Sequence, residues 1–238
     1  MSDRAEPAPR PLVDGISVSI AVGVVALTFG VLARTSGLTV GKTCAMSLLV
    51  FTGASQFAAV SVAAQGGSMA AVLGASLLLA ARNTLYGPVV SRWFEHLGRP
   101  RRMLLAQFIL DESTGVGAAQ PAADGPDPTR HNRIGFLAGG LGVYVLWNLG
   151  TLVGALAGNV VGDVGRWGLD AAFPASFVAL LAPHLSHRPC RFAALIAAVL
   201  TIVSVPVLPI GVPVLVGALA VLPAAWFTGP DEDEPVLP

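Results

Sequence analysis

The sequence predicts an all-α, polytopic membrane helix bundle with about seven transmembrane helices. Three observations lead to this prediction. Only 12% of the 238 residues are charged and 54% are hydrophobic, whereas a typical soluble domain carries roughly 25% charged residues. Asp, Glu, Lys and Arg are absent from four long blocks, 15–33, 43–81, 134–162 and 192–230. These blocks show no alternation of period two, so they predict helices rather than the strands of a membrane barrel.

The lengths of the uncharged blocks set the expected helices. A helix needs about 20 residues to cross the roughly 30 Å of bilayer hydrocarbon, so blocks 43–81 and 192–230 must each hold two spans. Gln65–Ser68 supplies one turn and Pro206–Pro213 the other. The expected helices, in chain order, are 15–33, 43–64, 68–90, 134–158, 169–183, 191–207 and 210–227.

The chain divides by composition into a polar N-terminal lead (1–14), a transmembrane domain (15–227) and an acidic C-terminal tail (228–238). A basic loop or interfacial segment, 91–133, interrupts the transmembrane domain. The first apolar run is longer than the 7–15 residues of a signal-peptide core, so we expect it to remain as the first helix.

The basic residues predict an orientation. With seven crossings and the N-terminus outside, ten basic residues lie in cytoplasmic loops and three lie outside, as the positive-inside rule favours. Faint similarity of 23–27 to 142–146, and of 54–60 to 174–180, suggests an inverted repeat of three plus three helices, which many transporters have. Chance similarity between helices rich in small residues explains it equally well.

Polar residues inside the apolar blocks are the candidate functional residues, because polar groups in hydrocarbon are costly. The first cluster contains Gly53, Ser55, Gln56 and Phe57. Its small residues permit a break in the helix, and the freed backbone N–H groups could bind a carboxylate. The alternative, which the spacing by itself favours, is a helix-packing seam held by Gln56.

Charged residues form the second group, with a role in proton coupling or charge balance. Arg82 lies inside the third expected helix, where an arginine costs about 2.5–3.5 kcal/mol on insertion scales. It could snorkel to the interface or pair with a carboxylate of the substrate or of the protein. Asp111 and Glu112 follow an apolar stretch, 103–110. They could carry a proton, hold Arg82, or only cap a solvated turn.

Asp170 and Phe177 lie at the start of the short expected helix 169–183. Asp170 could contact a substrate, although N-capping is a complete structural explanation for it. Trp147 and Asn148 add polar atoms to the fourth expected helix, where a tryptophan is more often a packing residue.

The sequence predicts no metal, no other cofactor and no enzyme. His184, His187 and Cys190 have a spacing that zinc could accept, but a fourth ligand is absent, so ordinary loop histidines are expected. The sequence contains no phosphate-binding loop and no hydrolase or metalloprotease motif. ATP-driven transport by this chain is therefore not expected.

Seven short segments between about residues 12 and 227 form one ordered pattern. They are Phe29-Gly30-x-Leu32-Ala33, Gly53-Ala54-Ser55-Gln56-Phe57, Arg82-x-x-Leu85-Tyr86, Asp111-Glu112, Trp147, Gly168-Leu169-Asp170 and Pro174-Ala175-x-Phe177. Together they resemble the AzlC-type branched-chain amino acid permeases.

The resemblance implies a secondary transporter that exports branched-chain, valine-like amino acids across the bacterial plasma membrane. It also implies a small AzlD-like membrane subunit as a partner, and coupling to the proton gradient rather than to ATP. We expect Gly53, Ser55, Gln56 and Asp170 to hold the charged groups of the amino acid, and aromatic residues such as Phe57 and Phe177 to receive its side chain. The alternative is a non-transporting membrane subunit that stabilises or regulates another membrane complex.

Overall fold

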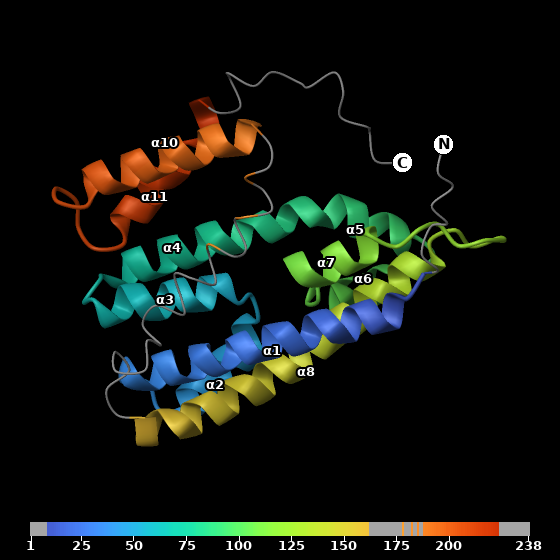
Figure 1. Ribbon diagram of the computed structural model, residues 1–238, viewed down its shortest axis with the longest axis horizontal. Coiled ribbons are helices and arrows are strands. Elements are labelled where there is room, and N and C mark those ends of the chain that lie inside the picture. The colour runs from blue at the N-terminus through green and yellow to red at the C-terminus, as the bar shows by residue number, and fades with distance from the viewer. Residues whose placement is uncertain (1–8, 162–177, 179–181, 183–184, 186–187, 224–238) are drawn as a thin grey trace, which may run out of the picture.

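The computed structural model describes residues 9–161, 178, 182, 185 and 188–223, and in this part of the chain the regular structure is helical without a strand. Figure 1 shows the helices as a bundle of roughly aligned rods. The elements are α1 (Pro11–Thr35), α2 (Val40–Val50), α3 (Ala54–Ala64), α4 (Met69–Ala81), the 3₁₀ helix η1 (Arg82–Tyr86), α5 (Gly87–Trp93), α6 (Arg99–Ala106), α7 (Asp111–Ala118), α8 (Arg130–Val161), α10 (Arg188–Ser204) and α11 (Val212–Ala218).

Three of the described stretches are long and apolar enough to cross a membrane: Pro11–Thr35, Met69–Trp93 and Arg130–Gly158. They correspond to the expected helices 15–33, 68–90 and 134–158. The chain is therefore an all-helical, multi-pass membrane protein. The expected helix 169–183 lies almost wholly outside the described residues, so the count of seven spans and the repeat of three plus three stay predictions.

α1 and α8 pack side by side along a seam of small residues (Figure 1). A Cβ atom on Gly15 would lie 2.6 Å from the Cβ of Ala138, and one on Gly23 would lie 2.9 Å from the Cβ of Leu146. Such close approach stabilises helix pairs in lipid through van der Waals packing. Because the contact positions rise together along both helices, α1 and α8 run in the same direction. Seven successive crossings would make the first and fourth expected helices run in opposite directions, and that part of the predicted topology is wrong.

The expected single helix 43–64 is also wrong, because the chain reverses at 51–53. α2 runs against α8, and the Ser47 hydroxyl donates to the Thr151 hydroxyl at 3.3 Å. α3 runs along α1, since Phe57 packs on Phe29 with ring centroids 5.3 Å apart. The reason is local: Gly53 has φ +46° and ψ −85°, which residues with a Cβ rarely adopt. We name α2, 51–53 and α3 the first hairpin.

The second crossing is made by α4, η1 and α5 together. The 3₁₀ stretch η1 lies near the middle of this crossing. Pro88, at the start of α5, has no N–H to continue the α-helical hydrogen bonds. A second hairpin follows, formed by α6, 107–110 and α7. Its α7 runs against α8, because Gly139 lies against Ser113 and Gly135 lies against Val116.

Each hairpin enters and leaves the bundle at the same end, and this explains why α1 and α8 run in the same direction. The first hairpin enters and leaves at the end where α1 finishes, and the second enters and leaves at the end where α1 begins. Neither adds a crossing, so α4–α5 provides the one return between α1 and α8.

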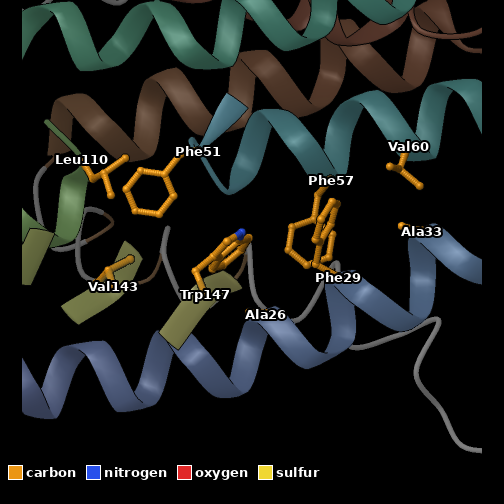
Figure 2. Close-up of a cluster of buried hydrophobic side chains, with 9 residues drawn as sticks. All are labelled: Ala26, Phe29, Ala33, Phe51, Phe57, Val60, Leu110, Val143 and Trp147. Atoms are coloured by element: carbon orange, nitrogen blue, oxygen red, sulfur yellow. The ribbon is translucent and has the colours of Figure 1, made fainter. Parts of the chain in front are cut away.

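Both hairpin tips are anchored in one buried apolar cluster between α1, α3 and α8. Figure 2 shows Phe29, Phe57 and Trp147 gathered at its centre, with Phe51 and Leu110 from the two tips nearby. Phe29 and Trp147 stack with ring centroids 6.0 Å apart. The tips therefore meet deep inside the bundle, about midway along α1 and α8.

The basic residues separate strongly between the two ends of α1–α8. Arg34 and Lys42 lie at the end where α1 finishes. The other end, which we name the N-terminal end, holds Arg10, Arg92, Arg99, Arg101, Arg102, Arg130 and Arg133. Arg34, Lys42, Arg92 and Arg99 are all among the ten basic residues that the seven-crossing topology places in cytoplasmic loops. That expectation is wrong, because it counted the first hairpin as a crossing.

α10 and α11 form an antiparallel pair against α4. The Thr201 hydroxyl donates to the carbonyl of Pro213 at 3.5 Å, and Leu215 lies against Gly74.

Candidate functional site

The two hairpin tips bring two helix N-termini together inside the bundle. α3 begins at Ala54 and α7 begins at Asp111, and the two helices run away from each other toward opposite ends. The start of a helix carries partial positive charge, although in α3 the N–H groups of Ser55 and Gln56 already donate to the carbonyls of Thr52 and Gly53. The middle of this bundle therefore favours a negatively charged group.

A cavity of about 330 Å³ lies between the tips and η1. Its polar lining comes from Thr52 of the first tip, Asn83 and Thr84 of η1, and Gln107 of the second tip. Its apolar lining is Leu49, Val50, Phe51, Ala80, Gly87, Ala106 and Ile109. A few polar groups set in an apolar wall are typical of a site for a small ligand.

An ion pair joins η1 to the start of α7. Its members do not line the cavity, but they lie one and two residues in sequence from Asn83 and Ile109, which do. Arg82 Nη2 lies 2.6 Å from Asp111 Oδ2, and the two side chains are 37% and 23% exposed. The second carboxylate oxygen, Asp111 Oδ1, is buried without a hydrogen-bond partner, and so is Asn83 Oδ1. Both oxygens can accept a hydrogen bond from an ammonium group, and the Asp111 carboxylate can also bind a proton. Glu112, the next residue of α7, is half-buried.

The first sequence cluster shapes the first hairpin and does not line this cavity. Gln56 is fully buried, and its amide nitrogen donates to the Met46 carbonyl at 2.8 Å, which joins α3 to α2. Ser55 and Thr52 share a hydrogen bond across the tip. Phe57 packs against Phe29 and Trp147. These contacts give Gln56 and Phe57 a packing role, and Gln56 Oε1 is buried without a hydrogen-bond partner, so a role in binding stays a prediction.

Trp147 and Asn148 lie on α8 behind the first tip. A Cβ on Gly53 would lie 3.4 Å from the Trp147 ring, so the glycine also provides room for that ring. The Asn148 amide donates to the Tyr144 carbonyl at 2.8 Å. Trp147 Nε1 and Asn148 Oδ1 are buried without a hydrogen-bond partner.

Other predicted residues fall outside this site. Asp170, Phe177, His184 and His187 lie outside the described residues. Cys190 is a free cysteine. In the described part of the chain, no three His, Cys, Asp or Glu side chains are placed to hold a metal ion.

The polar stretches 51–57 and 82–86 contain three of the polar residues that line the cavity, but none of these three was predicted to bind a substrate. Thr52, Asn83 and Thr84 lie beside predicted residues, but Gln107 was not considered. The available signal was a polar residue, Gln107, in the middle of the apolar stretch 103–110. Only the chain reversal after Gln107 shows that this stretch reaches the middle of the bundle.

Comparison with known proteins gives a consistent result. Residues 17–161, which contain both hairpins and the cavity, match the family described as AzlC protein. An uncharacterized membrane protein of Archaeoglobus fulgidus is 32% identical over 192 residues, 77% of this chain and 78% of that protein. The inner membrane protein YgaZ of Escherichia coli is 28% identical over 229 residues, 92% of this chain and 91% of that protein. No solved structure matches the chain.

Proposed function

We propose that this chain, which belongs to the AzlC family of membrane proteins, is a transporter. It is a secondary active transporter that exports branched-chain, valine-like amino acids across the plasma membrane. Its partner is a small AzlD-like membrane subunit, and it uses no ATP.

The cavity between the hairpin tips is the observation that supports this proposal. Its volume of about 330 Å³ lies at the lower limit of ligand pockets, which measure about 300–1,000 Å³. That size suits a single amino acid better than a peptide. The aliphatic side chain packs against Leu49, Val50 and Ile109, and Thr52, Asn83 and Gln107 receive the polar groups.

The charges beside the cavity suit the two ends of a zwitterion. The carboxylate is placed toward the N-terminus of α3 and the Arg82 guanidinium, because both are positive. The ammonium group is placed toward Asp111 Oδ1 and Asn83 Oδ1, which have no hydrogen-bond partner in the described structure. Protonation of Asp111 weakens its pair with Arg82 and frees the guanidinium for the substrate. Asp111, with Glu112 beside it, is therefore the proposed proton carrier.

The two hairpins suit alternating access. The first hairpin lies between the cavity and the end where α1 finishes, and the second lies between the cavity and the N-terminal end. Movement of one hairpin at a time opens the cavity to one side of the membrane. Gln56, Ser55 and Trp147 act through the first tip. Asp170 and Phe177 remain proposed contributors to binding from outside the described residues.

The basic residues orient the transporter. Seven arginines lie at the N-terminal end of α1–α8, against Arg34 and Lys42 at the other. By the positive-inside rule, the N-terminal end faces the cytoplasm. The substrate then enters past the second hairpin and leaves past the first.

Valine efflux from cells that carry this chain and its partner tests the proposal. Asn83→Ala and Thr52→Val are expected to reduce efflux at low internal valine by at least tenfold, because each removes a hydrogen bond to a charged ligand worth about 1.5–3 kcal/mol. Thr35→Val, the same substitution at an exposed position on α1, is the matched control. If both cavity variants export valine at the normal rate, the cavity is not the substrate site.

The alternative, a non-transporting subunit, rested on helices rich in small residues. In the structure, the glycine seam packs α1 against α8 within this chain. It therefore gives no reason to prefer that alternative.

A further inference from the structure

A second cavity lies between α5 and α6, and its lining extends to Arg99 at the N-terminal end. Its volume is about 430 Å³. Arg99 and Arg102 line one end of it, and Ile109 lines the other. We name it the α5–α6 groove.

The groove is polar at one end and apolar along the rest. Arg99, Arg102 and Ser91 are its polar side chains, and Val90, Phe94 and Leu105 belong to its apolar wall. Among the residues that the structure describes, neither guanidinium has an acidic partner within salt-bridge distance. The Ser91 hydroxyl already donates to the Pro88 carbonyl at 2.8 Å. Two unpaired positive charges therefore stand at the mouth of an apolar groove.

The length of the groove matches one leaflet of a bilayer. A helix rises about 1.5 Å per residue, so the chain from Arg99 to Ile109 descends roughly 10–15 Å into the bundle. Half of the hydrocarbon thickness of a bilayer is about 15 Å. Arg99 and Arg102 then lie at the level of lipid headgroups, and Ile109 lies near the midplane.

We propose that the α5–α6 groove binds one anionic phospholipid of the cytoplasmic leaflet. The lipid phosphate accepts hydrogen bonds from Arg99 and Arg102, since guanidinium groups match phosphate oxygens in geometry and charge. One acyl chain lies against Val90, Phe94 and Leu105. A small zwitterionic solute is a poorer occupant, because it would pass charged groups along a mostly apolar wall.

The proposed lipid also adjoins the substrate cavity. Gly87, Ala106 and Ile109 line both cavities. An acyl chain in the groove therefore contacts the wall of the second hairpin and stabilises its position. The lipid site does not depend on the proposed transport function, and its test measures binding alone.

The test measures binding of phosphatidylglycerol and phosphatidylcholine to the purified full-length chain in detergent, by native mass spectrometry. The wild type is expected to prefer phosphatidylglycerol. The double variant Arg99→Gln/Arg102→Gln is expected to bind it about 30-fold more weakly, from the usual contribution of two arginines at an anionic membrane surface. Arg101→Gln is the matched control, because Arg101 lies on the same helix and outside the groove lining. Circular dichroism establishes that each variant is folded.

Several results would overturn the proposal. Equal affinity for the two lipids would show that the arginines do not select a charged headgroup. Unchanged affinity in the double variant, or an equal loss in Arg101→Gln, would place the lipid elsewhere. Protection of a Ser91→Cys variant from maleimide by valine and not by phosphatidylglycerol would make the groove a route for solute. Inorganic phosphate serves as a further probe, and binding as tight as that of the lipid would make this a simple anion site.

Discussion

Removal of one member of the Arg82–Asp111 ion pair is expected to destabilise the protein. The charged atoms lie 2.6 Å apart, and the side chains are 37% and 23% exposed. Breaking a fully buried pair costs about 3–5 kcal/mol, and an exposed pair contributes about 0–1 kcal/mol. These side chains lie between the two cases, so Asp111→Asn is expected to cost about 2 kcal/mol, mainly because Arg82 is left as an unpaired charge.

The double variant Arg82→Gln/Asp111→Asn separates the ion pair from its members. It leaves no unpaired charge, so it is expected to cost at least about 1 kcal/mol less than the sum of the single variants. Unfolding of the purified chain in detergent, followed by tryptophan fluorescence, measures these differences. The double variant is expected to export less valine than the wild type, because it lacks both the proposed proton carrier, Asp111, and the Arg82 guanidinium.

The ion pair between Arg133 and Asp127 provides a matched control. It lies at the membrane edge, where Asp127 has a side chain 44% exposed. The hydrogen bond from Arg133 lowers the pKa of Asp127 below its ordinary value. Asp127→Asn is expected to cause a smaller loss of stability than Asp111→Asn and to leave efflux unchanged. If the single variants at Arg82 and Asp111 are as stable as the wild type, or if their effects are additive, the reasoning about the ion pair is refuted.

Two further predictions concern topology and packing. In a chain whose own cysteines are replaced, Thr35→Cys and Gln65→Cys are expected to react with a membrane-impermeant maleimide from outside intact cells, and Asp124→Cys only after permeabilisation. Reaction of the first two from opposite sides would contradict the first hairpin. Gly154→Ala is expected to cost about 1–3 kcal/mol by overpacking, because its Cβ would press on a main-chain carbonyl of α1. Gly41 has open space around it, so Gly41→Ala is expected to be neutral or stabilising by up to about 1 kcal/mol. Equal unfolding midpoints for Gly154→Ala and Gly41→Ala would argue against the close α1–α8 contact.

The membrane location followed from the sequence alone, because solvent preference is a property of composition. Long blocks without charged residues cannot form the surface of a soluble protein, and the helices 15–33, 68–90 and 134–158 are each long enough to cross. The polar stretches 51–57 and 82–86 contain residues that line the cavity, and their part in substrate binding stays a prediction. A polar group placed in an apolar helix has a local cost that is visible in the sequence.

The tertiary structure decided how these segments meet. Residues 43–64 are apolar and long enough for one span, so only the reversal at Gly53 shows that they form a hairpin. That reversal decides that α1 and α8 run in the same direction and that Arg34 lies away from Arg92. It also places Thr52 in the cavity and Gln56 behind it. Direction and neighbourhood depend on a few backbone torsions and on contacts between residues far apart in the chain, whereas the hydropathy of a segment is the same in either arrangement.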